Sequence, residues 1–187
     1  MPVKAQTPLE EYLKLPEGYP AELIKGEIVV SPSPDVKHQR IAGTIYEKLL
    51  KHKNVGEPFY EIDIHFDGEN VLRPDVIFIR NENKKIIGEK WIEGAPDIVV
   101  EIVSPTSSGR DFIEKKEIYE KFGVKEYWIV DPENKVIQVF VYNEKKEKFE
   151  LFSSANLEEK GKNIIKSNIL ENFKLNLNEI FEVREHE

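Results

Sequence analysis

The fold is decided by the stretch Arg73-Pro74-Asp75-Val76-Ile77-Phe78-Ile79, together with the later stretch Pro96-Asp97-Ile98-Val99-Val100-Glu101-Ile102-Val103-Ser104. Both stretches have the apolar, β-branched composition of a buried β-strand. Each also carries a carboxylate, Asp75 in the first and Glu101 in the second, at a place where packing alone favours Val or Ile. A buried charge costs free energy unless an opposite charge compensates it. The pair therefore predicts a bound cation or a positive side chain next to both strands.

The composition limits the class of protein. With 187 residues and 40% hydrophobic content, the chain is expected to form one domain, residues 1–187, with its own hydrophobic core. No apolar run is long enough to cross a bilayer, and the start of the chain lacks the pattern of a signal peptide, so we expect a cytoplasmic protein without membrane contact. The formal net charge of −8 disfavours a surface that coats polyanions, but it leaves room for a local basic groove.

The chain contains no cysteine, which restricts its chemistry. Disulfides, thiolate catalysis and cysteine-bound zinc are excluded, so the remaining metal ligands are carboxylates, histidine and water. Ligand sets rich in oxygen favour hard cations such as Mg²⁺.

Apolar periodicity and turn signals predict strands that alternate with helices. The predicted helices are Thr7–Leu15, Val36–His52 and Arg110–Phe122. The predicted strands are a hairpin over Glu22–Ser31 with its turn at Lys25-Gly26, Pro58–Phe66 and Leu72–Arg80 joined by a turn at Asp67–Asn70, Asp97–Ser104, Glu126–Val130, and a hairpin of Lys135–Tyr142 with Lys148–Phe152. The two strands that flank the third helix are expected to pair in parallel. The rest is expected to be a polar tail with a few anchors, Ile164, Ile169, Leu175 and Ile180.

Strand alternation places Glu101 on one face of its strand with Asp97, Val99 and Val103. Asp75 follows a proline, so it lies near the start of its strand or at a bulge. If the two strands are neighbours, both carboxylates reach one divalent cation, and such a centre suits phosphodiester hydrolysis. The alternative is that Asp75 caps a turn while Glu101 pairs with a basic side chain. The presence of both carboxylates favours the metal site.

The third predicted helix carries a stripe of Asp111, Lys115 and Tyr119, which are four residues apart. Lys115 can project from this stripe toward the strand carboxylates, or it can be an ordinary solvated lysine. The adjacent Lys116 fits the pattern equally well. His38, at the start of the second helix, is expected to be a surface or capping residue.

Further basic residues surround these candidates. They are Arg110, Lys115, Lys116, Lys121 and Lys125 on the third helix and its exit, and Lys37 and Arg40 beside His38. They either line a groove that receives DNA, or they are ordinary solvent-exposed residues that pair with glutamates on the helix surface. The sequence favours neither interpretation.

Several motifs follow one another in a fixed order. They are Glu22-Leu23-Ile24-Lys25-Gly26-Glu27, Ser31-Pro32-Ser33-Pro34 with His38, Arg73-Pro74-Asp75-Val76, Val100-Glu101-Ile102-Val103-Ser104-Pro105, Asp111 with Lys115 and Tyr119, and Gly123-Val124-Lys125-Glu126-Tyr127-Trp128-Ile129-Val130-Asp131-Pro132. In this order they resemble the Uma2 family of restriction-type endonucleases. The order of the motifs carries the likeness, rather than any single motif.

The resemblance implies the PD-(D/E)xK nuclease fold, an α/β (α+β) restriction-endonuclease-like architecture with a central mixed β-sheet flanked by helices. It also implies a DNA endonuclease that depends on Mg²⁺, with Mn²⁺ as a substitute. In this pattern Asp75 and Glu101 are catalytic metal ligands, and Glu22 completes the metal site or supports it. Val103 stands where the wider superfamily usually has lysine, so the catalytic lysine is expected on the following helix, at Lys115.

Two further expectations follow from the resemblance. The partner is duplex DNA, and a two-fold homodimer is expected because duplex cleavage requires a cut in each strand. The alternative function is a catalytically inactive nuclease-fold protein that acts by binding DNA or another protein.

Overall fold

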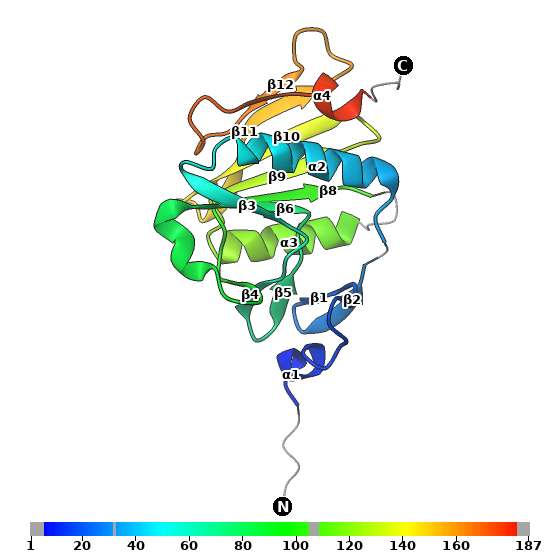
Figure 1. The fold of residues 1–187 in the computed structure, drawn as a ribbon, viewed down its shortest axis with the longest axis vertical. Coiled ribbons are helices and arrows are strands. Elements are labelled where there is room, and N and C mark those ends of the chain that lie inside the picture. Colours follow the sequence, from blue (N-terminus) through cyan, green and yellow to red (C-terminus); the bar gives the residue numbers. More distant parts are fainter. Residues whose placement is uncertain (1–5, 32, 105–108, 183–187) are drawn as a thin grey trace, which may run out of the picture.

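The computed structural model describes residues 6–31, 33–104 and 109–182 (Figure 1). Its helices are α1 (Pro8–Tyr12), α2 (Val36–Leu50), the 3₁₀ helix η1 (Asn81–Ile86), α3 (Gly109–Lys121) and α4 (Asn178–Phe181). None of the helices in these ranges is long and apolar enough to cross a membrane.

The strands of the described residues form three sheets. The large sheet has the order β11-β10-β9-β8-β6-β3, with bounds β11 (Lys148–Asn156), β10 (Val136–Asn143), β9 (Glu126–Asp131), β8 (Ile98–Ile102), β6 (Val76–Arg80) and β3 (Gly56–Tyr60). The small sheet has the order β2-β1-β5-β4-β7, with bounds β2 (Glu27–Val30), β1 (Ala21–Ile24), β5 (Asn70–Leu72), β4 (Ile64–Asp67) and β7 (Ile92–Glu93). The third sheet pairs β12 (Ile164–Lys166) with β13 (Lys174–Asn176).

The predicted class, a mixed sheet flanked by helices, is confirmed. β8 and β9 pair in parallel, as expected for strands joined through a helix, whereas β6 is antiparallel to β8. The hairpins β1–β2, β4–β5 and β10–β11 are also present where turn signals predict them.

The large sheet has a different layer on each face. One face packs against α2, β12, β13 and α4, and we call it the α2 face. The other packs against α3 and the small sheet, and we call it the α3 face. The alternation predicted for β8 follows this division, because Ile98, Val100 and Ile102 lie in the core of the α2 face and Val99 lies in that of the α3 face.

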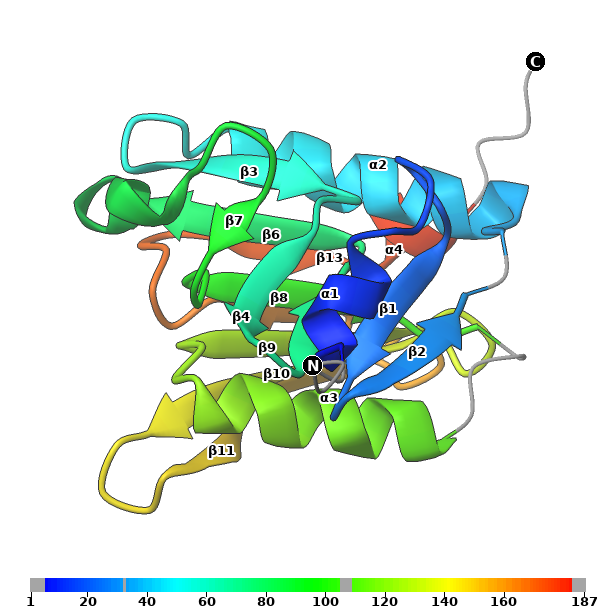
Figure 2. The same ribbon diagram turned by 90° about the horizontal axis from the view of Figure 1, so that it is seen from below.

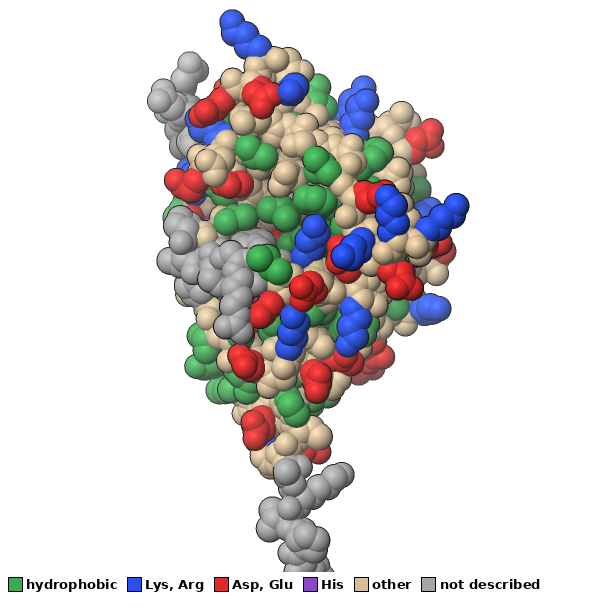
Figure 3. Space-filling model, turned by 180° about the vertical axis from the view of Figure 1, so that it is seen from behind, with side chains coloured by type: hydrophobic (Ala, Val, Ile, Leu, Met, Phe, Trp, Pro, Cys, Tyr) green, Lys and Arg blue, Asp and Glu red, His purple; other side chains and the backbone are tan. Residues whose placement is uncertain are grey.

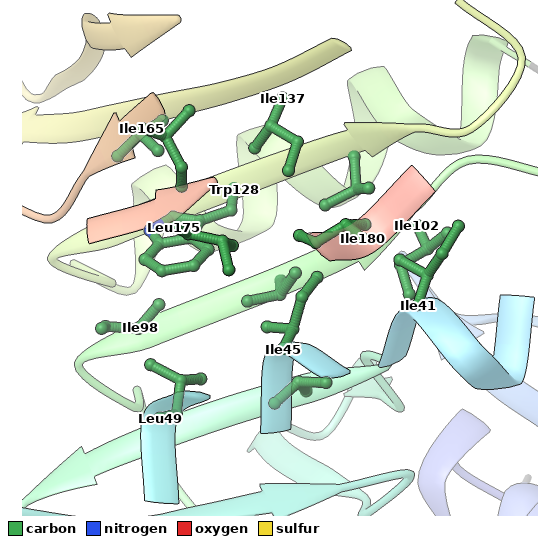
Figure 4. Close-up of a cluster of buried hydrophobic side chains, with 14 of the residues drawn as sticks. Ile41, Ile45, Leu49, Ile98, Ile102, Trp128, Ile137, Ile165, Leu175 and Ile180 are labelled. Atoms are coloured by element: carbon green, nitrogen blue, oxygen red, sulfur yellow. The ribbon is translucent and has the colours of Figure 1, made fainter. Parts of the chain in front are cut away.

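The core of the α2 face is built by residues at helical spacing. Ile41, Ile45 and Leu49 project from α2 toward the large sheet, where Trp128 fills the space beside them (Figure 4). All four side chains are buried to 99% or more. Full burial of one such side chain stabilises the fold by about 1.5–3 kcal/mol, so this layer fixes α2 against β8 and β9.

Two predicted strands are wrong as continuous elements. The stretch Pro58–Phe66 is divided into β3 and β4 at Glu61, whose φ of 49° is incompatible with a strand. The stretch Leu72–Arg80 is divided into β5 and β6 by Pro74, which has no N–H group for a strand ladder. In both cases one half belongs to the small sheet and the other to the large sheet. Asp75 therefore lies where the chain passes between the sheets.

The predicted polar tail is also wrong. Residues 164–181 form β12, β13 and α4, which cover part of the α2 face (Figure 1). Ile165, Leu175 and Leu177 are fully buried there, and Leu170 and Ile180 are almost so. Polar residues separate these apolar side chains, so the stretch lacks the continuous apolar run of a core strand.

Candidate active site

A cavity of about 670 Å³ opens where the small sheet, the first turn of α2 and the start of β6 meet. The polar side chains that line its interior include Glu22, His38, Arg73, Asp75, Glu101 and Lys115. The structure therefore brings all four predicted site residues, Glu22, Asp75, Glu101 and Lys115, to one cavity.

Strand register places the two central carboxylates opposite each other. In the antiparallel pair of β6 and β8, Val76 is the partner of Val100, so the next step of the ladder brings Asp75 to Glu101. Asp75 Oδ2 accepts a hydrogen bond of 2.6 Å from the N–H of Ile102. This bond fixes the Asp75 side chain across the end of β8.

Glu101 is only 5% exposed and has two partners on α3. The Lys115 ammonium lies 3.2 and 3.3 Å from its two carboxylate oxygens, and the Tyr119 hydroxyl donates a hydrogen bond of 2.6 Å to Oε1. Burial raises the pKa of Glu101 to about 7; Lys115 opposes this shift, and the charges of Asp75 and Glu22 add to it. The carboxylate therefore lies among more negative charge than Lys115 compensates.

Lys115 connects Glu101 to Glu22. Its Nζ atom lies 2.9 Å from Glu22 Oε2 and 3.2 Å from Glu101 Oε1. Burial lowers the pKa of Lys115, but the two carboxylates more than reverse this effect and raise it, so the side chain stays an ammonium. The sequence could not decide whether Lys115 or Lys116 faces the carboxylates. In the structure the Nζ atom of Lys116 lies 4.5 Å from the ring centre of Phe140 instead.

Glu22 is held from both sides. Its Oε1 atom accepts a hydrogen bond of 2.7 Å from the N–H of Arg73, and its Oε2 atom contacts Lys115. The Arg73 guanidinium is turned away to Asp63, with Nε 2.6 Å from Oδ1, and the Tyr12 hydroxyl donates to the same carboxylate. Both Glu22 oxygens have partners in the chain, as do both oxygens of Asp75, and the contact with Oε2 fixes the position of the Lys115 ammonium.

His38 also lines the cavity, next to Asp75. We expected a surface or capping role, but its Nε2 atom lies 3.2 Å from Asp75 Oδ1 and its side chain is 14% exposed. Burial lowers the pKa of His38, but the hydrogen bond and charge of Asp75 outweigh this and raise it. The available signal was position, because His38 lies three residues before Ile41 and so on the buried stripe of α2.

The other basic residues of α3 and its surroundings form ion pairs at the surface. The pairs are Lys37 with Glu133 at 3.0 Å, Lys121 with Asp67 at 3.1 Å and Lys125 with Glu144 at 3.4 Å. Figure 3 shows Lys and Arg side chains interspersed with Asp and Glu on one face of the molecule. These contacts support the solvation interpretation for these lysines. Arg110 and Asp111 have side chains outside the described part of the structure.

The donor chemistry of the cavity fits a hard divalent cation. Within residues 6–31, 33–104 and 109–182, no three carboxylate or histidine side chains already converge as metal ligands. Asp75 and Glu101, which are opposite each other on neighbouring strands, supply two carboxylates of the cavity, and Glu22 supplies a third. Mg²⁺ fits such a set, because it keeps several waters and combines one or two carboxylates with the oxygens of a substrate phosphate.

Comparisons with known proteins identify the family of the chain and a shared fold. Residues 9–178 match the family Uma2, described as a putative restriction endonuclease. This chain belongs to the Uma2 family. A crystal structure of a putative nuclease belonging to DUF820 from Anabaena variabilis ATCC 29413 is similar to the Uma2 chain with a TM-score of 0.75 and 24% identity, over 95% of this chain and 98% of that chain. That likeness shows a shared fold, and no curated protein matches the chain.

Proposed function

We propose that this Uma2 chain is a DNA endonuclease that depends on a divalent metal. The observation that carries the proposal is the convergence of Asp75, Glu101 and Lys115 on one cavity, with Lys115 within 3.3 Å of Glu101. Family membership and the nuclease-like fold support the reaction class.

Asp75 and Glu101 would hold Mg²⁺ or Mn²⁺ in this reaction. When bound, the cation supplies charge for the phosphate and lowers the pKa of a water molecule. The chain itself positions both ligands before substrate arrives, because the Ile102 N–H fixes Asp75 and the Tyr119 hydroxyl fixes Glu101.

Lys115 and Glu22 act on the phosphate side of the site. In hydrolysis a water oxygen bonds to phosphorus, one P–O ester bond breaks, and the released oxygen takes a proton. Lys115 is charged and faces the cavity, so it can orient the water or donate hydrogen bonds to the negative charge that develops on the phosphate. Glu22 holds the ammonium in place at 2.9 Å.

Metal binding and cleavage test the proposal together. Titration of Mg²⁺ or Mn²⁺ into the purified chain is measured by calorimetry, and hydrolysis of labelled DNA is followed with and without the cation. The expected results are cation binding at millimolar concentration or tighter and cleavage that stops with chelator. Asp75→Asn is expected to lose both, whereas a wild-type chain that binds neither cation would remove the metal site.

A second candidate function is binding without cleavage. The observation in its favour is that the Lys115 ammonium already lies between Glu22 and Glu101, where it neutralises part of the cluster without any cation. Such a protein would bind DNA or a protein partner with no response to divalent metal. Cation titration therefore distinguishes the two functions.

Duplex cleavage adds two measurable expectations. A two-fold homodimer would present one cavity to each strand, and sedimentation of the purified chain with and without DNA tests this. Affinity for DNA should fall with salt concentration, because each phosphate contact contributes about −0.9 to the slope of log K against log salt. Ca²⁺ should strengthen binding without cleavage, because it compensates the site carboxylates.

A further inference from the structure

The site carboxylates lie deep in the cavity. Glu22 is 4% exposed, Glu101 is 5% exposed and the Asp75 side chain is 17% exposed, so a phosphate that contacts all three carboxylates has to enter the cavity. A DNA duplex is stiff, with a persistence length of about 50 nm, and carries its phosphates on the outside of a wide cylinder. A single strand bends sharply and can lead one phosphate into a recess of about 670 Å³.

The mouth of the cavity is acidic. Asp35 and Glu61 line it with exposed carboxylates, and a third carboxylate, Glu133, is paired with a lysine. Lys37, an exposed ammonium of the same lining, lies 3.0 Å from Glu133 and is neutralised by it. A surface of this charge repels a substrate that brings many phosphates at once. It repels a short flexible segment less.

Among exposed apolar side chains, Val30 lines the cavity, whereas Val36 and Tyr60 lie outside the lining and are sequence neighbours of lining residues. Val30 lines the cavity and is 58% exposed, and Val36, at 67%, lies between two lining residues. Figures 1 and 2 place β2, which carries Val30, and the first turn of α2, which carries Val36, on the same side of the molecule. Tyr60 precedes the lining residue Glu61, is 58% exposed, and rests edge-on against the Tyr46 ring at 5.2 Å. An exposed ring held in this way offers a stacking surface for a base.

We propose that the segment of DNA that enters this cavity is unpaired. The phosphate goes to the carboxylates and Lys115, while the bases beside it pack on Val30, Val36 and Tyr60. Bases are free to make these contacts only where they have left the duplex, because in a duplex they are stacked and paired inside it. This inference rests on the proposed nuclease function and specifies its substrate.

The test compares one labelled sequence in three forms: a single strand, a blunt duplex, and a duplex with a central unpaired bubble. Affinity is measured by fluorescence anisotropy in Ca²⁺, and cleavage is measured in Mg²⁺. We expect the single strand and the bubble to bind more tightly than the blunt duplex and to be cut at unpaired nucleotides. Tyr60→Ala should weaken binding of the unpaired forms about tenfold. Phe152→Ala, which removes an aromatic side chain 47% exposed on β11, is the matched control and should change nothing.

The outcomes separate this inference from the proposed function. Equal or tighter binding of the blunt duplex, or an unchanged affinity in Tyr60→Ala, overturns the inference even when the chain cuts DNA. A chain that cuts none of the three forms loses the nuclease function, and the preference measured in Ca²⁺ still decides whether the cavity receives unpaired DNA. Melting temperatures of both variants confirm that a lost affinity is not lost folding.

Discussion

Two buried glutamates occupy neighbouring strands of the large sheet and face opposite sides. Glu126 on β9 is fully buried on the α2 face, and Glu101 on β8 is 5% exposed on the α3 face. The Glu126 carboxylate accepts hydrogen bonds from neutral donors: Trp128 Nε1 at 2.5 Å, the Ser167 hydroxyl at 3.1 Å, and the N–H groups of Asn168 at 2.9 Å and Ile169 at 3.3 Å. Glu101 instead faces an ammonium and two further carboxylates.

The difference separates a structural charge from a site charge. Burial raises the pKa of Glu126, and its four hydrogen-bond donors oppose the shift. Through these donors Glu126 connects β9 to the segment that leads into β13. The pKa of Glu101 is raised by burial and by the charges of Asp75 and Glu22, and Lys115 and Tyr119 offset only part of this rise. The two glutamates are both buried but differ in the charges beside them, and this difference is the basis for proposing Glu101 rather than Glu126 as a site residue.

The largest expected effect is on catalysis. It is tested by replacing each of the two glutamates by glutamine, which exchanges one carboxylate oxygen for an amide nitrogen. Glu101→Gln should reduce metal-dependent DNA cleavage on the order of 10³-fold, which corresponds to about 4 kcal/mol of transition-state stabilisation. It should also abolish Mn²⁺ binding, as measured by calorimetry. Melting at pH 7 should be unchanged or higher, because one of the mutually repelling charges is removed.

Glu126→Gln is the matched control for this experiment. It changes the same atoms in a carboxylate that has no contact with the cavity, so cleavage per folded molecule should be retained. Equal losses of cleavage in the two variants would contradict the division between a structural and a site glutamate.

The next largest effect is on stability, at Glu126. Glu126→Ala leaves the N–H group of Asn168 and the indole N–H without their acceptor and removes one of the two acceptors of the Ile169 N–H, so we expect a loss of about 3 kcal/mol in the free energy of unfolding. For a chain of this length that lowers Tm by about 10 °C. Urea unfolding measures the first value and calorimetry the second. Limited proteolysis should show earlier cleavage after β11, and an unchanged Tm would count against the structural role.

A smaller effect separates the two adjacent lysines. Lys115→Ala should reduce cleavage on the order of 10²-fold and leave Mn²⁺ affinity largely intact, because its contribution begins when charge develops on the phosphate. Lys116→Ala removes only a contact with the Phe140 ring and should keep wild-type cleavage. Steady-state cleavage rates of the two variants on one DNA substrate show which lysine contributes to catalysis. Reversed losses would move the catalytic role to Lys116.

Many features of the α3 face can be predicted from the sequence because they depend on residues that are close together in the chain. Charged residues stand out in the apolar runs around Asp75 and Glu101, and the spacing of Lys115 and Tyr119 fixes the face of their helix. The large sheet, both long helices and the parallel pairing of β8 with β9 follow from period and turn chemistry. The choice of Lys115 over Lys116 does not, because it depends on where α3 packs.

The parts that the sequence did not predict depend on tertiary contacts. Pro74 marks the break between β5 and β6 locally, but the assignment of the two strands to separate sheets depends on their pairing partners. Residues 164–181 look polar because their apolar side chains are separated, yet Glu126 and Trp128 hold that segment on the core. His38 acquires its role from Asp75, a residue far away in the sequence. Pairings of this kind leave no local pattern.

The smallest expected effect is the pH dependence of stability without metal. The pKa of Glu101 is raised from its ordinary value of 4.5 to about 7, chiefly by burial, so between these values the folded chain binds more protons than the unfolded chain. Stability therefore falls as pH rises through this window and levels off above about 7. Relative to Glu101→Gln, which cannot titrate, wild-type Tm should fall by about 4–8 °C between pH 5 and pH 8, equivalent to about 2 kcal/mol. Saturating Mn²⁺ should remove this dependence, because metal binding requires the deprotonated carboxylate. If the Tm of wild type and the Tm of Glu101→Gln change in the same way with pH, the pKa of Glu101 does not change when the chain folds. That result would remove the contrast with Glu126.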